Sequence, residues 1–101
     1  MRVMVFFDLP VETSFERKQY AKFRKFLLND GFIMMQKSVY SKITINGPSS
    51  DAVIKNVYKH TPSNGIVQIL KITEKQFQSI EYIIGESQKE IVDSQQRFVI
   101  L

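Results

Sequence analysis

The sequence predicts a small α+β domain in which helices cover one face of an antiparallel sheet. The chain has 101 residues, of which 44% are hydrophobic and 24% charged, as in one soluble globular domain with a single core. Segments rich in β-branched and aromatic residues alternate with segments of helical periodicity. No apolar stretch approaches the roughly 20 residues that span a bilayer, and no secretory signal is recognisable. We therefore expect no membrane partner.

The first strand is expected over Val3 to Phe7, where five apolar residues follow one another. An uninterrupted apolar run of this length is typical of a strand covered on both faces. The strand then meets Asp8, and Leu9-Pro10 ends it. Because a carboxylate is costly to desolvate, its position directly after a buried strand makes Asp8 a candidate functional residue.

The first helix is expected from about Ser14 to Asn29. Thr13 and Glu16 have the spacing of a capping box, and Gly31 is a natural stop. Apolar residues at helical spacing form its core stripe: Tyr20, Phe23 and Leu27. Extended chain follows from Phe32 to Ile45. Periodicity leaves open whether this segment is one long strand or two strands with a break near Gln36-Lys37.

A turn is expected at "NGPSS", after which Ser49 or Ser50 would cap a second helix over about Asp51 to Lys59. Its inner side would carry Val53, Ile54, Val57 and Tyr58. The segment "IVQILKI" predicts another strand. Thr73 with Gln76 then indicates a short third helix whose inward residues are Phe77 and Ile80.

With the middle segment split, this order is the βαββαβ pattern of a ferredoxin-like sandwich with the first strand central. We expect one domain over residues 1–101, with a core at about 1–73 and a strand-bearing C-terminal extension at about 74–101. The second sheet face would be bare, and a second copy of the chain is its simplest cover. A terminal strand would dock on the partner's sheet edge or complete its own sheet, and it consists of Arg97, Phe98, Val99, Ile100 and Leu101.

The net charge of +4 comes entirely from the first part of the chain. Residues 1–42 hold eight Lys/Arg and four acids, whereas residues 43–101 hold six of each. On the first helix, one stripe carries Lys18, Lys22 and Lys25, while Arg17 and Arg24 flank the core stripe. Such a row can follow a phosphate backbone without reading bases, although a solvated helix face gives the same pattern.

Two chains meeting at the strand end would bring two copies of Asp8 together as oxygen ligands for Mg²⁺. The alternative is that Asp8 accepts hydrogen bonds from turn N–H groups before Pro10. The single histidine, His60, lies at a predicted helix C-terminus and makes neither a zinc site nor a triad by itself. The chain has no cysteine, which excludes thiolate chemistry and is compatible with the cytoplasmic location that we expect.

The first part of the chain resembles the small CRISPR-associated protein two family. The resemblance rests on a first strand ending in Asp8, an early helical Arg17, and "LLNDGF", which contains Gly31. It also rests on "QKSVYSK", which contains Gln36, Ser38, Val39 and Tyr40. The resemblance is strongest over residues 1–45 and continues as a fold pattern to about Thr73.

The resemblance implies a homodimer that acts in spacer acquisition, bridges dimers of the CRISPR integrase subunit and holds a short DNA duplex. Some members are described as Mg²⁺-dependent endonucleases on RNA or DNA, so Asp8 would be the metal ligand and catalytic carboxylate, with single-stranded RNA as a further ligand. The expected nucleic-acid-binding residues are Arg17, Lys18, Lys22, Lys25, Lys37 and Lys42. The alternatives are a stand-alone toxin-type endoribonuclease and a regulatory module that binds no nucleic acid.

Overall fold

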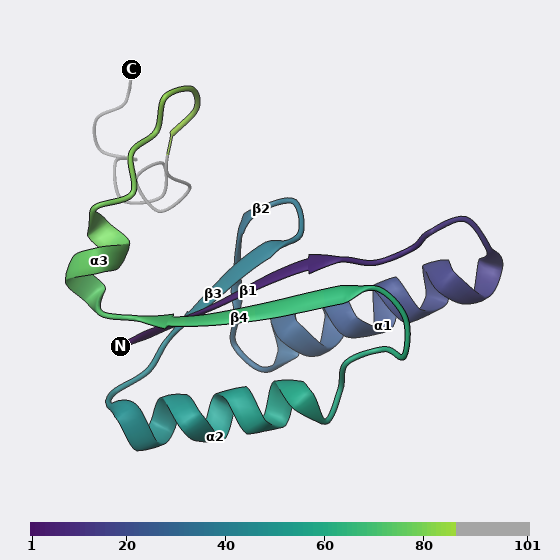
Figure 1. Ribbon diagram of the computed structural model, residues 1–101, viewed down its shortest axis with the longest axis horizontal. Coiled ribbons are helices and arrows are strands. Elements are labelled where there is room, and N and C mark those ends of the chain that lie inside the picture. Colours follow the sequence, from purple (N-terminus) through teal and green to yellow (C-terminus); the bar gives the residue numbers. More distant parts are fainter. Residues whose placement is uncertain (87–101) are drawn as a thin grey trace.

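The computed structural model describes residues 1–86, which form a four-stranded antiparallel sheet and three helices (Figure 1). The strand order is β2-β3-β1-β4, so the first strand is central as predicted. The ferredoxin-like βαββαβ arrangement is therefore confirmed, followed by one short helix. The elements are β1 (Arg2–Asp8), α1 (Ser14–Asn29), β2 (Ile33–Gln36), β3 (Val39–Ile43), α2 (Gly47–Tyr58), β4 (Ile66–Ile72) and α3 (Glu74–Gln78).

Helices α1 and α2 lie on the same side of the sheet (Figure 1). The core between them and β1 contains Val3, Val5 and Phe7, which alternate along the strand and are at most 5% exposed. The ring of Phe7 contacts the rings of Phe23 and Tyr40 at centroid distances of 5.2 and 5.6 Å. Each such buried side chain contributes about 1.5–3 kcal/mol to folding, so this cluster fixes β1 against the helices.

Helix α1 begins and ends where the sequence predicts. The hydroxyl of Thr13 accepts a hydrogen bond from the backbone N–H of Glu16, and the Glu16 carboxylate accepts the N–H of Thr13 in return. Gly31 follows the helix with φ of +101°, a conformation that glycine adopts without strain. Of the predicted core stripe, Phe23 and Leu27 are buried and Tyr20 is half-buried.

The extended segment forms two strands, which settles the alternative that periodicity left open. The break falls at Lys37-Ser38, where Ser38 has φ of +66°. The Ser38 carbonyl accepts a hydrogen bond from the backbone N–H of Phe7 at 3.0 Å. This tight reversal places β2 at the sheet edge and β3 beside β1.

The second helix begins four residues earlier than predicted, at Gly47. Its N-cap is Asn46 and not Ser49 or Ser50, because the Asn46 side chain accepts the Ser49 N–H at 2.9 Å. Proline in the first turn lacks only an N–H that has no helical partner there, so Pro48 extends the helix rather than interrupting it. Ser50 is buried and its hydroxyl lies 2.5 Å from that of Thr44.

Two side chains predicted to point inward are exposed instead. Tyr58 is 73% exposed because it lies at the end of α2, beyond the sheet face that Val57 contacts. Ile80 is 40% exposed because α3 ends at Gln78, before it can turn this residue toward the sheet. The α3 capping box of Thr73 and Gln76 is confirmed.

The predicted terminal strand, Arg97–Leu101, lies outside the described residues. Among residues 1–86, no helix combines the length and apolar character needed to cross a membrane.

Candidate functional site

Within residues 1–86, the sheet face opposite the helices is apolar and largely uncovered. Alternation along β1 directs Arg2, Met4, Phe6 and Asp8 to this face. In the antiparallel register, their neighbours on the same face include Ile43 beside Arg2, Leu70 beside Met4 and Ile66 beside Asp8. Four aliphatic residues of this face are 48–60% exposed: Ile33, Ile43, Ile66 and Leu70. We call these four residues and Phe6 the open face.

One end of this face is closed by α3. The Arg2 guanidinium donates to Glu74 Oε1 from Nε at 3.0 Å and from Nη2 at 2.6 Å, and it lies 3.8 Å from the centre of the Phe77 ring. Arg2 and Met4 are accordingly only 4% and 6% exposed. Figure 1 shows α3 at the end of the sheet where β1 begins, away from the end where β1 stops. The open face therefore extends toward Asp8.

Asp8 lies at the rim of the open face. It is exposed, and within residues 1–86 its carboxylate makes no hydrogen bond or ion pair. The alternative in which it caps the turn before Pro10 has no hydrogen bond to support it. The described residues contain no group of three or more His, Cys, Asp or Glu that could hold a metal ion. At this strand end one chain offers one free carboxylate, and a second chain would add another, within the one or two carboxylates by which Mg²⁺ is usually held together with water or phosphate.

A glycine that sequence reasoning did not single out fixes the backbone at this strand end. Gly65 has φ of +99°, and a Cβ atom added to it would lie 2.8 Å from the Asp8 carbonyl oxygen and 2.8 Å from Leu9 Cδ2. The loop before β4 thus contacts the backbone of Asp8 directly. The Asn64-Gly65 dipeptide is a recognised turn signal, but its contact with Asp8 depends on strand pairing across 57 positions of sequence.

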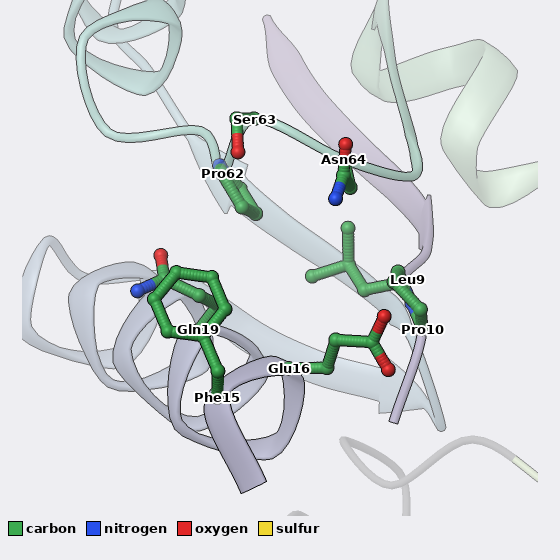
Figure 2. A pocket seen from close by; sticks show the side chains of 8 residues that line it. All are labelled: Leu9, Pro10, Phe15, Glu16, Gln19, Pro62, Ser63 and Asn64. Atoms are coloured by element: carbon green, nitrogen blue, oxygen red, sulfur yellow. The ribbon is translucent and has the colours of Figure 1, made fainter. Parts of the chain in front are cut away.

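The two loops at this strand end also form a small joint (Figure 2). Leu9 and Pro10 from the β1–α1 loop face Pro62, Ser63 and Asn64 from the α2–β4 loop, with the first turn of α1 beside them. The space between them is about 10 Å³, enough for about one water molecule. This joint is a packing contact that orients the end of β1, rather than a ligand site.

Replacing Gly65 with alanine should destabilise the protein by about 2–4 kcal/mol, because strain at positive φ adds to overpacking against Asp8 and Leu9. The free energy of urea unfolding measures this change. Gly47→Ala is the matched control, because no atom lies within 4 Å of its added Cβ and its φ is not positive. An equal loss in both variants would contradict the proposed contact at Gly65.

The three lysines of the predicted stripe are brought together on one exposed surface of α1. Lys18, Lys22 and Lys25 are all exposed, and the only acid of the helix, Glu16, is held in the capping box. We call these three lysines the basic stripe. Arg17 precedes Lys18 on the helix, but its side chain bonds back to the loop before α1. Its Nη1 donates to the carbonyl oxygens of Val11 and Glu12 at 3.1 and 2.9 Å.

The other two predicted basic residues lie apart from the stripe. Lys37 is exposed in the β2–β3 turn. Lys42 is half-buried on the helix side of β3, where its Nζ lies 3.5 Å from Asp30 Oδ2 and donates to the Asp30 carbonyl. This ammonium ties β3 to the end of α1, where α1 offers its unpaired carbonyl groups. The structure thus assigns Lys42 a partner within the chain.

Comparison with known proteins identifies the family. A family model described as CRISPR associated protein Cas2 matches residues 1–80, from β1 through α3. The chain belongs to the Cas2 family. This confirms the resemblance found in the residues around Asp8, Gly31 and Ser38. The Cas2 match also spans every element from which the open face and the basic stripe are built.

Curated relatives named CRISPR-associated endoribonuclease Cas2 match along the whole chain. The protein from Treponema denticola is 50% identical and that from Ligilactobacillus salivarius 48% identical, each over 101 residues covering 100% of both chains. The protein from Streptococcus mutans serotype c (strain UA159) is 46% identical over 100% of this chain and 93% of its own. The Cas2 assignment thus includes the C-terminal residues.

Proposed function

We propose that this Cas2-family chain is a homodimeric, nucleic-acid-binding subunit of CRISPR adaptation. Two copies would contact each other through the open face, bridge two dimers of the integrase subunit and hold a short DNA duplex destined for the array. The observation that carries this proposal is the open face itself, an exposed aliphatic surface with a free carboxylate, Asp8, at its rim.

The exposed aliphatic side chains support self-association. Soluble monomers rarely expose large contiguous apolar patches, and such patches mark interaction sites. A two-fold dimer buries the same patch on both copies, which suits a face whose only charged members are at its ends, Arg2 and Asp8. Within residues 1–86, edge strand β4 has one unpaired side, and we propose that the terminal strand, Arg97–Leu101, docks on that edge in the partner.

The basic stripe supports duplex binding. Three ammonium groups along one helix face can each neutralise a backbone phosphate without contacting bases. A homodimer would carry two such stripes, one on each copy. Each neutralised phosphate releases condensed counterions, so affinity for a duplex should fall steeply as salt rises.

Lys25→Ala should lower the slope of log affinity against log salt by about 0.9 per chain for duplex DNA, because one phosphate contact is lost. Fluorescence anisotropy with a labelled duplex over a salt series measures the slope. Lys75→Ala is the matched control, since Lys75 is an exposed lysine on α3, away from α1. Equal slopes for the wild type and Lys25→Ala would contradict the basic stripe as the duplex-binding surface.

We also propose a second activity, Mg²⁺-dependent endonuclease cleavage, with RNA as the first substrate to test. It is supported by the names of the relatives, which are called endoribonucleases, and by the free carboxylate of Asp8. The Asp8 residues of two chains would hold the ion. When bound, Mg²⁺ polarises a scissile phosphate and activates water.

A further inference from the structure

A cationic hollow lies between α1 and the C-terminal end of α2. Its volume is about 190 Å³, and its polar lining comes from Gln19 and Lys22 of α1 and from Lys59, His60 and Thr61 after α2. Among residues 1–86, no acidic side chain lines it. Lys59 and His60 were not among the residues expected to bind nucleic acid. Sequence reasoning could not join them to Lys22, because they follow a different helix.

The imidazole of His60 is held in one orientation. Its ring stacks on that of Phe26, with centroids 4.0 Å apart and planes 9° from parallel. Nδ1 lies 2.8 Å from the carbonyl oxygen of Asn56. A carbonyl oxygen only accepts hydrogen bonds, so Nδ1 carries a hydrogen in both charge states of the ring. Nε2 is consequently the atom that gains or loses the proton, and no hydrogen bond within residues 1–86 occupies it.

The groups around this imidazole are cationic. Lys22 lines the same hollow from α1, and Lys59, the residue before His60, lines it just after the end of α2. The terminal carbonyls of α2 favour a positive charge at the same place. The neighbouring acid, Asp30, accepts a hydrogen bond from the Asn56 amide at 3.3 Å and is paired with Lys42. Asp30 is not among the residues that line the hollow. Protonated His60 would therefore share the hollow with two exposed ammonium groups, an arrangement that a bound anion would stabilise.

We propose that this hollow binds one phosphate group of a nucleic-acid backbone through protonated His60 Nε2–H, Lys22 and Lys59. The inference rests on the proposed nucleic-acid binding and extends that surface from the basic stripe across to the end of α2. Lys22 belongs to both sets, which makes the phosphate path continuous. A protonated Nε2–H gives this contact a charge-assisted hydrogen bond, so the contact strengthens as pH falls.

The test uses the fact that His60 is the only histidine of the chain. Affinity for a labelled DNA duplex is measured at pH 7.0 and 5.5, each over a salt series. The wild type should bind about threefold more tightly at pH 5.5, with a salt slope steeper by about 0.9. His60→Asn should lose both changes, because its amide can still donate to the Asn56 carbonyl but does not titrate. His60→Lys should bind equally tightly at the two pH values.

The outcomes separate this inference from the proposed function. No duplex binding by the wild type at either pH would overturn the proposed function as well. Duplex binding in which His60→Asn keeps the wild-type pH dependence would overturn the phosphate site alone. A final arm follows the single set of imidazole NMR signals in the wild type. Equal perturbation by inorganic phosphate and by duplex at the same phosphate concentration would overturn the assignment to a nucleic-acid backbone.

Discussion

Asp8→Asn should abolish Mg²⁺-dependent cleavage, with a loss of at least about 10³-fold in rate, while leaving the fold intact. The substitution removes the negative charge of both paired ligands, and electrostatic stabilisation of charge in the transition state is commonly worth this much. Asp8 is exposed and makes no hydrogen bond within residues 1–86. Its loss should therefore change the free energy of unfolding by less than about 0.5 kcal/mol.

Cleavage of a labelled RNA by purified protein, with Mg²⁺ and with chelator, measures this effect. Glu12→Gln is the matched control, because Glu12 is an exposed acid four residues further along the chain. Unchanged cleavage by Asp8→Asn would indicate a contaminating nuclease. Spacer acquisition in cells gives a separate readout, since holding DNA does not require the carboxylate. Loss of acquisition by a folded Asp8→Asn dimer would contradict a purely DNA-holding role.

Leu70→Arg should convert the proposed dimer into a folded monomer. Leu70 is 48% exposed and lies beside Met4 in the register of β1 with β4, in the middle of the open face. In a two-fold dimer, two guanidinium groups would be desolvated without partners, at a cost of about 3–5 kcal/mol. That cost corresponds to a weakening of dimerisation by roughly 100-fold or more. The monomer should remain folded because the side chain is exposed.

Sedimentation velocity at micromolar concentration measures the change. Phe15→Arg is the control, because Phe15 is 63% exposed but lies on α1, on the other side of the sheet. Leu70→Arg that sediments as the wild-type dimer would show that the open face is not the interface. The same monomer should also lose Mg²⁺-dependent cleavage, because separated chains present one Asp8 each.

Local signals in the sequence predicted most of the fold. The capping boxes of Thr13 and Thr73 act within one helical turn, so they define the starts of α1 and α3 without reference to the rest of the chain. The predicted start of α2, Asp51, was wrong because the contact that decides it is not local. Asn46-Gly47-Pro48 is compatible with both a turn and a helix N-terminus, and the choice depends on Ser50 reaching the hydroxyl of Thr44 in the interior.

The candidate site residues could be predicted only where a single residue or a single helix carries them. Asp8 follows its strand directly, and the lysines of the basic stripe share one helix, so periodicity alone aligns them. Lys42 follows no such rule: its position on the helix side of β3 and its ion pair with Asp30 depend on how β3 pairs with β1. The hollow at His60 likewise needs two helices side by side.

The sequence by itself determined the order of the elements, the central apolar strand with its terminal carboxylate, and the basic stripe, because each depends on residues within a few turns of one another. Only the tertiary structure decided which half of the second sheet face stays open, since Arg2 meets Glu74 across 72 positions. It also brought Gly65 against Asp8 and His60 against Phe26. Contacts between distant segments depend on which strands pair and how the helices pack on them, and residues within a few turns of one another do not determine either.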